Sequence, residues 1–375
     1  MASLLPTIDP DGLLEYSVVY TDRALNHMSQ AFQTVMRDIS TTLKQVYNAS
    51  AVVIVPGSGT FGMEAVARQF ATGQNCLVIR NGYFSFRWTQ IFEMGQIPAK
   101  STVITARPTE SQHPAFFAPP PIDEVVTTIQ QERPSVVFMP HVETSAGIIL
   151  PNDYIRAVAD AVHAVGGLLV LDCIASGTIW VDMVACGVDV LVSAPQKGWS
   201  GPPCSGLVML SPLALEKLES TTSTSFACDL AKWRQIMVAY ENGGHAYHAT
   251  MPTDALRAFR DVMQETATYG FDRVQQQQQD LGDKIRALMT AKGIKSVAAP
   301  GFQAPSVIVS YTDDKMIQTG KAFMTLGMQI AAGVPLKCGE PEDFQTFRIG
   351  LFGLDKLQNV ERTVAKFEAV LQQVF

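Results

Sequence analysis

Residues 51–64 read AVVIVPGSGTFGME, and this stretch sets the expected fold. Its first five residues, Ala51–Val55, are apolar and mostly β-branched, and no polar residue interrupts them. Such a run predicts a strand that is buried on both faces, as in a parallel sheet covered by helices. A turn rich in Gly, Ser and Thr follows, and a helical pattern starts directly after it. This order of strand, turn and helix is the basic unit of an α/β fold.

The same unit recurs along the chain from about residue 50 to about residue 210. Each apolar run is followed by a polar or Gly-rich turn and then by helical periodicity; the helix expected over Asn152–Val165, for example, ends at Gly166. Repetition of this unit predicts a doubly wound α/β domain. The six expected strands are Ala51–Val55, Cys76–Ile79, Ser135–Met139, Leu168–Leu171, Val188–Val192 and Leu207–Leu210.

From about residue 270 the pattern changes to that of a smaller α+β domain. Phe271–Lys292 predicts a long helix, and we expect its five consecutive glutamines, Gln275–Gln279, on a solvated face. Further elements are expected as strands at Ser306–Tyr311 and Thr346–Gly350 and as helices at Met316–Leu326 and Leu357–Val374. We therefore expect an N-terminal arm at 1–22, a large domain at 23–268 and a small C-terminal domain at 269–375.

The composition excludes several classes of protein. Hydrophobic residues make up 47% of the 375-residue chain, which is too apolar for a disordered protein. The net charge of -7 argues against nucleic acid or an anionic membrane as the main partner. No apolar run reaches the roughly 18 residues that a membrane helix needs, and the N-terminus lacks the features of a secretory signal. We therefore expect a cytoplasmic protein.

The six cysteines are too sparse for a disulfide scaffold. They form no CxxC pair, and no histidine lies at metal-ligand spacing from them. We therefore expect buried thiols and no metal site.

In an α/β sheet, ligands bind beyond the carboxyl ends of the strands, so the residues that follow each strand carry the chemistry. The turn Gly57–Gly62 opens a helix, where backbone N–H groups and the hydroxyls of Ser58 and Thr60 can hold an anion. The same turn matches the GxGxxG pattern of dinucleotide-binding proteins. That pattern requires an acidic residue about 20 positions further on, and none occurs between Glu64 and Glu93. The missing acidic residue counts against a dinucleotide site, but Arg80 could serve instead in an NADP-type site, so a nicotinamide-dependent oxidoreductase is kept as an alternative.

Two charged residues follow other buried strands. Asp172 ends the run Leu168–Leu171, where a carboxylate is costly to bury without a partner such as an arginine or a cationic ring nitrogen. Lys197 lies between a buried strand and a Gly/Pro-rich loop, where desolvation lowers the pKa of an amine and favours a Schiff base. An anion cradle, aromatic residues near Phe84, a strand-end Asp and a loop Lys together indicate pyridoxal 5′-phosphate.

The order and spacing of several segments over about residues 50–350 resemble class V aminotransferases of the fold-type I pyridoxal-phosphate enzymes, in particular the alanine–glyoxylate / serine–pyruvate aminotransferase family. The resemblance implies a large domain with a mostly parallel seven-stranded sheet and a smaller C-terminal α+β domain. The matching segments are GSGTFGMEA, NGYFSFRW, HVETSAG, LVLDCIAS to SAPQKGWSGPP, AYHATMP and FRIGLFG.

This resemblance also implies a role for each candidate residue. Lys197 forms the internal aldimine and moves the proton between Cα and C4′, while Asp172 keeps the pyridine nitrogen protonated. Phe84 stacks on the ring, and Arg348 pairs with the α-carboxylate of the substrate. The remaining cofactor contacts are implied for Ser58, Gly59 and Thr60 at the phosphate, Thr144 and Gln196 near O3′ or the phosphate, and Tyr247 and Thr250 at the phosphate of a neighbouring subunit.

A homodimer with shared active sites follows from that last implication, as does ping-pong transamination between a small amino acid and a 2-oxo acid. Alanine or serine is the expected donor, and glyoxylate or pyruvate the expected acceptor. The chain departs from the family at its N-terminus, where no Pro-Gly-Pro turn occurs and Tyr16 and Tyr20 are candidates to line the substrate pocket. A lyase such as a cysteine desulfurase, using Cys338, is the alternative within the same fold.

Overall fold

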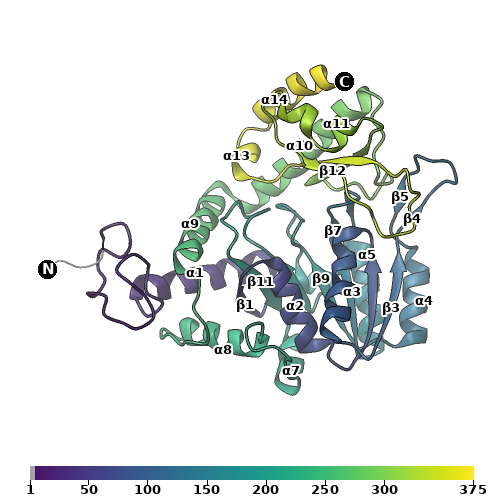
Figure 1. The fold of residues 1–375 in the computed structure, drawn as a ribbon. Coiled ribbons are helices and arrows are strands. Elements are labelled where there is room, and N and C mark those ends of the chain that lie inside the picture. Colours follow the sequence, from purple (N-terminus) through teal and green to yellow (C-terminus); the bar gives the residue numbers. More distant parts are fainter. Residues whose placement is uncertain (1–4) are drawn as a thin grey trace.

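A seven-stranded sheet forms the centre of the large domain in the computed structural model, which describes residues 5–375 (Figure 1). The strands lie in the order β1-β11-β10-β9-β6-β2-β3, and all neighbours are parallel except the two pairs that β11 makes. The predicted α/β fold class with a mostly parallel sheet is therefore confirmed. The strands are β1 (Ala51–Pro56), β2 (Asn75–Arg80), β3 (Lys100–Thr105), β6 (Val136–Pro140), β9 (Leu168–Asp172), β10 (Val190–Ser193) and β11 (Ser205–Leu210).

Two strands differ from the sequence-based expectation. β11 is antiparallel to both neighbours, although its uninterrupted apolar run was typical of a parallel strand. It lies between β1 and β10 and is buried along its whole length, and burial on both faces produces the same pattern in either direction. β3 was not predicted, because this edge strand is partly solvated and begins with the exposed residues Lys100 and Ser101.

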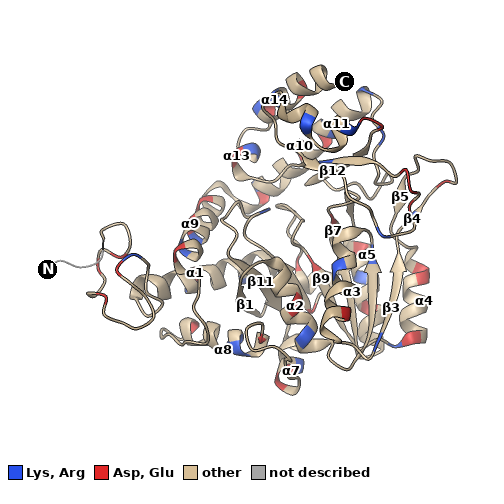
Figure 2. Cartoon of the chain, in the orientation of Figure 1, with Lys and Arg blue, Asp and Glu red and all other residues tan. Residues whose placement is uncertain are grey.

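Helices pack on both sides of the sheet, and most of the charged residues lie on these helices and on the loops rather than on the strands (Figure 2). The short strands β4 (Arg107–Pro108) and β5 (Phe117–Ala118) form one hairpin, and β7 (Val142–Glu143) and β8 (Ile148–Ile149) form another. The helices of this part of the chain are α1 (Gln30–Tyr47), α2 (Gly59–Phe70), α3 (Tyr83–Gly95), α4 (Ile122–Glu132), α5 (Asn152–Ala164), α6 (Met183–Cys186), α7 (Pro212–Ser220), α8 (Leu230–Glu241) and α9 (Thr253–Tyr269).

The C-terminal part builds a second layer above the sheet in Figure 1, with a core of its own. Its small sheet has the order β12-β14-β13, with strands β12 (Val307–Tyr311), β13 (Ala331–Ala332) and β14 (Thr346–Gly350). Its helices are α10 (Phe271–Ala291), α11 (Lys315–Gln318), α12 (Lys321–Met324), α13 (Leu354–Leu357) and α14 (Val360–Val374). The separate core is consistent with the expected division near residue 268, which stays a prediction.

Three details of the small domain differ from the expectation. The helix expected at Met316–Leu326 is two short helices, because the chain turns at Gly320 with a φ of 79° that favours glycine. The helix expected at Leu357–Val374 is α14, which begins three residues later, at Val360, and the short helix α13 before it was not predicted. Gln278 is not solvated: it is fully buried and donates hydrogen bonds to the carbonyl oxygens of Pro305 and Leu351.

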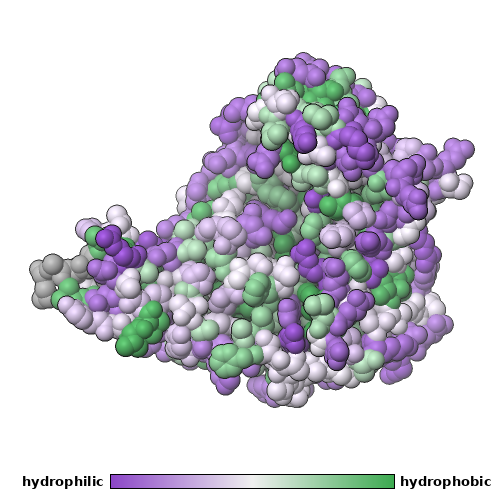
Figure 3. Space-filling view, in the orientation of Figure 1, coloured by the Kyte–Doolittle hydropathy of each residue, from purple (hydrophilic) through white to green (hydrophobic). Residues whose placement is uncertain are grey.

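The described part of the expected N-terminal arm, residues 5–22, extends to the left of the body in Figure 1, and residues 1–4 of that arm lie outside the described range. The Tyr20 hydroxyl donates a hydrogen bond to the carbonyl oxygen of Met251 (3.1 Å), which ties the arm to the start of α9. Large side chains of the arm are solvent-exposed, with Leu13 at 89% and Tyr16 at 90% exposure, and hydrophobic residues, coloured green, are visible on this side of Figure 3. Within residues 5–375, none of the helices has the length and apolar character to cross a membrane.

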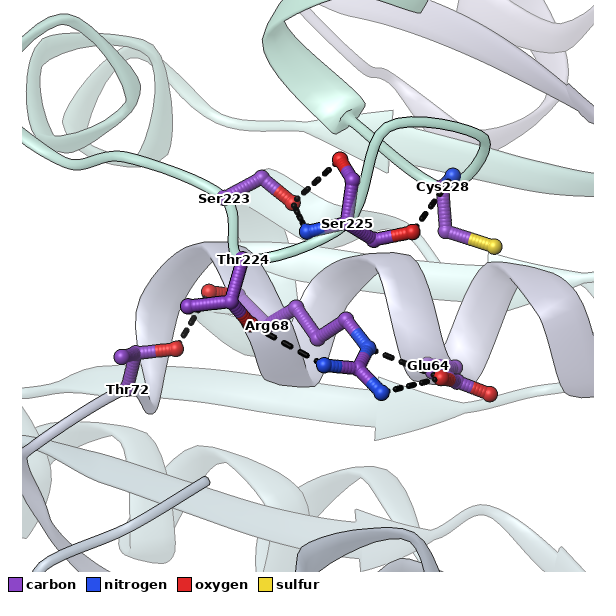
Figure 4. Close-up of polar contacts among 7 residues, drawn as sticks. All are labelled: Glu64, Arg68, Thr72, Ser223, Thr224, Ser225 and Cys228. Atoms are coloured by element: carbon purple, nitrogen blue, oxygen red, sulfur yellow. Dashed lines mark hydrogen bonds and ion pairs between the residues drawn. The ribbon is translucent and has the colours of Figure 1, made fainter. Parts of the chain in front are cut away.

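The second half of α2 is anchored to the loop between α7 and α8 (Figure 4). Arg68 donates hydrogen bonds from Nε to Glu64 Oε1 (2.8 Å) and from Nη1 to Thr224 Oγ1 (3.1 Å). Within the loop, the Ser225 hydroxyl accepts a hydrogen bond from the amide of Cys228. These contacts fix the direction of a helix whose other end lies at the candidate site.

Candidate active site

The carboxyl ends of β1, β2, β6, β9 and β10 lie at one edge of the sheet, and residues that follow them line a cavity of about 200 Å³. Because parallel strands end at the same edge, side chains far apart in sequence meet there. The cavity is lined by eight of the predicted site residues, namely Ser58, Gly59, Thr60, Phe84, Thr144, Asp172, Gln196 and Lys197.

Asp172 is the last residue of β9, and its carboxylate is buried with few hydrogen-bond donors around it. Its Oδ1 accepts a bond from the amide of Ile174 (2.9 Å), and no other residue among 5–375 donates to this carboxylate. The pKa of Asp172 is raised to about 6, mainly by burial and to a lesser extent by the negative Glu143, while the hydrogen bond from Ile174 and the cations Lys197 and Arg87 oppose the shift. A buried carboxylate so short of donors suits the cationic N–H of a ligand.

Lys197 lies in the loop between β10 and β11, on the same cavity. Its Nζ lies 5.3 Å from the centroid of the Phe352 ring and, within residues 5–375, makes no hydrogen bond or ion pair. Burial lowers the pKa of the amine, Asp172 opposes this effect, and the cations Arg348 and Arg87 add to it. A lowered pKa increases the neutral fraction, which is the form that attacks a carbonyl carbon.

The N-terminus of α2 points its free amides at the cavity. Ser58 is the N-cap residue, but its hydroxyl does not cap the helix. The amides of Gly59 and Thr60 have no hydrogen-bond acceptor within the described part of the chain. A Cβ on Gly59 would lie 2.5 Å from Ile174 Cδ1, so glycine lets this end of α2 approach the loop after β9. Free amides and the helix dipole together favour an anion.

Two arginines flank Phe84, each with its guanidinium carbon 5.4 Å from the centroid of that ring. Arg348, on β14, donates from Nε to the carbonyl oxygen of Ala332 (2.8 Å). Arg87 lines the cavity and donates from Nη1 to Thr60 Oγ1 (3.1 Å). Neither forms an ion pair with a residue in the range 5–375, so both can pair with an anionic ligand.

Arg87 was missed in the sequence analysis. The signal was its spacing: residues 84 and 87 are separated by three positions on α3, and residues at that spacing share a helix face. Burial lowers the pKa of Arg348, and the negative charge of Glu143 opposes that shift.

Tyr247 and Thr250 lie apart from this cavity. Their side-chain oxygens are 3.2 Å from each other, and Tyr247 is 56% exposed. The Tyr247 ring packs 5.6 Å from that of His27 on the arm side of the domain. Neither residue lines the cavity of its own chain. The arm residues Tyr16 and Tyr20 do not line it either.

Cys338, the thiol of the lyase alternative, is held as a neutral thiol. Burial raises its pKa to about 12, and its Sγ lies 3.5 Å from the carbonyl oxygen of Arg80. Because the thiolate is the nucleophilic form, this environment does not favour attack by Cys338.

A comparison with profiles of protein families identifies the family of this chain. A profile described as aminotransferase class V matches residues 12–333, which is most of the chain. The chain belongs to the class V aminotransferase family. The solved alanine–glyoxylate aminotransferase of Nostoc sp. superposes with a TM-score of 0.78 at 22% identity, covering 93% of this chain and 89% of that one. The recognition made from the sequence motifs is therefore confirmed.

Two relatives whose names state a function align with most of this chain. The L-aspartate–glyoxylate aminotransferase of Paracoccus denitrificans is 26% identical, over 88% of this chain and 81% of its own length. A protein of Synechococcus sp. named soluble hydrogenase, small subunit, is 27% identical, over 98% of this chain and 92% of its own length.

As a class V aminotransferase, the enzyme uses pyridoxal 5′-phosphate, and the residues of the cavity fit that cofactor. The free amides of α2 suit its phosphate, and Lys197 suits its aldehyde. The under-bonded carboxylate of Asp172 suits its protonated ring nitrogen. The ring of Phe84 lines the same cavity and offers an aromatic surface to the planar ring.

Proposed function

We propose that this aminotransferase moves the amino group of a small amino acid, alanine or serine, to glyoxylate or pyruvate by a ping-pong mechanism. The observation that carries the proposal is that Asp172, at the end of β9, and Lys197, in the loop after β10, border one cavity together with the open N-terminus of α2. The names of two relatives, which transfer amino groups to glyoxylate, support glyoxylate as acceptor.

Each side chain then has a defined task. The bound cofactor supplies an electron sink for the charge that develops at the substrate Cα. Lys197 would hold the cofactor, and its amine, once displaced by substrate, would take the proton from the substrate Cα and deliver it to C4′ of the cofactor. Asp172 holds the positive charge on the ring nitrogen through an ion pair in a buried setting.

Arg348 binds the α-carboxylate of both substrates in this proposal. Its Nε is engaged by Ala332, which fixes the guanidinium and leaves the Nη atoms for bidentate pairing. The phosphate contacts are proposed for Ser58, Gly59 and Thr60. Thr144 and Gln196, which also line the cavity, are proposed to contact the ring oxygen or the phosphate.

We further propose a homodimer in which Tyr247 and Thr250 reach the phosphate in the partner's cavity. Both are remote from the cavity of their own chain, and Tyr247 is exposed in the protomer. The exposed apolar side chains of the arm, such as Leu13, would be covered in such a dimer. Light scattering of the purified protein tests whether it is a dimer. If the protein is a dimer but Tyr247→Phe leaves its cofactor affinity unchanged, the shared site is contradicted.

A cytoplasmic location and the domain boundaries 22/23 and 268/269 are also part of the proposal.

The decisive experiment is a half-reaction. The purified protein with bound cofactor is mixed with single amino acids, and the absorbance of the lysine-bound cofactor is followed as it converts to the amine form. We expect loss of that band with alanine or serine, recovery with glyoxylate, and neither change in Lys197→Ala. The matched control is Lys292→Ala, an exposed lysine remote from the cavity. Full turnover in Lys197→Ala contradicts the proposal, and sulfide release from cysteine supports the lyase alternative.

A further inference from the structure

A buried carboxylate that no proposed catalytic step uses lies directly behind Phe84. Glu143 ends β7, is fully buried, and forms no ion pair with any residue in 5–375. Burying a charge without a counter-ion is costly unless hydrogen bonds replace its hydration shell. Here they do: five donor groups lie within hydrogen-bond distance of its two oxygens.

Two of these donors are the amides of the second and third residues of α3. Phe84 N–H donates to Oε1 (3.1 Å), and Ser85 N–H donates to Oε2 (2.9 Å). The Ser85 hydroxyl lies 2.6 Å from Oε2. The carboxylate therefore satisfies amides that a helix N-terminus leaves unpaired, and its charge lies at the positive end of the helix dipole.

The remaining two donors belong to Ser145, two positions after Glu143 in the chain. The Ser145 amide and hydroxyl both donate to Oε1 (3.1 and 2.7 Å), and the same hydroxyl accepts a bond from the amide of Tyr83 (2.8 Å). The turn that contains Thr144 is thus bonded to the start of α3 through one carboxylate. Phe84 and Thr144 both line the cavity, whereas Glu143 itself does not.

Gly82 makes this approach sterically feasible. A Cβ at that position would lie 2.1 Å from Ser145 Oγ and 2.7 Å from Glu143 Cγ. No side chain fits between the start of α3 and the carboxylate, so the two are in direct contact. A shorter link leaves less freedom for the backbone of Phe84, and the direction of its ring depends on that backbone.

We propose that Glu143 is a positioning residue for the cofactor. It holds the amides of Phe84 and Ser85 and the turn at Thr144, and it thereby sets the distance and tilt of the Phe84 ring against the cofactor ring. This proposal rests on the roles proposed for Lys197 and Phe84. Glu143 contacts the cofactor only through Phe84 and Thr144, so its removal alters how the cofactor is held before it alters any chemical step.

The test measures binding and spectrum rather than turnover. Cofactor-free protein is titrated with pyridoxal 5′-phosphate, and affinity is read from tryptophan fluorescence and ring geometry from the circular dichroism of the bound cofactor. In Glu143→Gln, one carboxylate oxygen becomes an N–H group that faces N–H donors. We expect affinity to fall about tenfold, because two helix amides lose their charged acceptor, and the dichroism band to shrink even at saturating cofactor.

The matched control is Asp189→Asn. Asp189 is 3% exposed and lies away from the cavity; it accepts hydrogen bonds from the amide of Leu169 (2.8 Å) and the hydroxyl of Ser211 (3.1 Å), and its Oδ2 lies 2.8 Å from His163 Nε2. This variant is expected to lose thermal stability while keeping wild-type cofactor affinity and dichroism. If it alters both as much as Glu143→Gln does, Glu143 has no specific role and the proposal is wrong.

A double-variant cycle shows whether Glu143 acts through Phe84. In a Phe84→Leu background, Glu143→Gln is expected to change affinity less than about twofold, because coupled residues are not additive. Additive effects contradict positioning through the ring.

If Glu143→Gln does not fold, Ser145→Ala takes its place in the test. Loss of the hydroxyl that links Tyr83 to Glu143 is expected to weaken cofactor binding about threefold. Unchanged affinity and dichroism in that variant then overturn the proposal. If wild-type protein forms no lysine-bound cofactor band, the proposed function itself has failed.

Discussion

Two helices begin at the same edge of the sheet, and their N-termini are satisfied in opposite ways. At α3 the protein supplies its own anion: the amides of Phe84 and Ser85 donate to Glu143. At α2 the amides of Gly59 and Thr60 have no acceptor within residues 5–375, and the Ser58 hydroxyl does not cap the helix. The completed N-terminus holds a wall of the cavity in place, whereas the open one is available for the phosphate of the cofactor.

The two carboxylates near the cavity show the same contrast. Among residues 5–375, Glu143 has five donors, while Asp172 has one, from Ile174. Burial of Asp172 raises its pKa to about 6, which means that its ionised form is destabilised in the free protein. Unsatisfied groups cost stability, and they are found where a ligand completes them. The number of donors thus distinguishes a carboxylate that builds the site, Glu143, from one that binds the cofactor, Asp172.

The largest effect is expected when the under-bonded carboxylate is neutralised. Asp172→Asn keeps the acceptor for the Ile174 amide but removes the charge that pairs with the ring nitrogen. We expect turnover to fall by about 10²–10³-fold, as when one electrostatic contact to a charged transition state is lost. Steady-state kinetics at saturating cofactor measure it. Turnover within twofold of wild type contradicts the assigned role of Asp172.

Filling the open N-terminus is expected to have the next largest effect. Ser58→Asp places a carboxylate where α3 has Glu143, and it repels the phosphate dianion. Cofactor affinity should fall by about 100-fold, since like charges in contact disfavour each other by a few kcal/mol. The cofactor-free protein should gain about 0.5–1 kcal/mol from the new cap. Fluorescence titration and thermal unfolding test both halves. Unchanged affinity contradicts the phosphate site at α2.

A smaller effect is expected from pH. The pKa of Asp172 is raised from 3.8 to about 6 in the folded protein. Between these values the folded chain binds more protons than the unfolded chain, so the stability of the cofactor-free protein rises as pH falls from about 6 towards 4. The contribution is roughly 2–3 kcal/mol and is absent in Asp172→Asn. Cofactor affinity should fall below about pH 6, by up to about tenfold per pH unit, because the ionised carboxylate must be restored.

Thermal unfolding of wild-type and Asp172→Asn protein at pH 4.5, 6 and 8 isolates this group from the others that titrate. The difference in stability between the two proteins should be largest at pH 8, in favour of the variant, and fall to about a third of that value at pH 4.5. A constant difference contradicts the assigned pKa shift.

The smallest effect is expected at a helix N-terminus with a purely structural cap. Ser29 caps α1 and accepts a hydrogen bond from the amide of Phe32 (3.1 Å). Ser29→Ala should cost about 1 kcal/mol of stability and leave cofactor affinity unchanged. Denaturant unfolding and titration with pyridoxal 5′-phosphate measure these. A change in affinity comparable to that of Ser58→Asp contradicts the distinction between structural and binding N-termini.

The sequence by itself determined which residues could carry the chemistry. Apolar runs such as Ala51–Val55 are local signals, and the carboxyl ends of such strands meet in space, so Asp172 and Lys197 could be assigned to one edge before the structure was known. The edge strand β3 was missed because a partly buried strand shows no clear periodicity. The helix break at Gly320 was missed because a single turn leaves no periodic signal.

Only the tertiary structure decided how these residues are held. Hydrogen bonds from Arg87 to Thr60 and from Phe84 to Glu143 join segments 27 and 59 residues apart, and no local pattern encodes such pairs. The placement of Tyr247 and Thr250 outside the cavity of their own chain also depends on the whole fold. Strand and helix patterns reflect interactions between near neighbours in sequence, whereas the satisfaction of a buried charge depends on every segment packed around it.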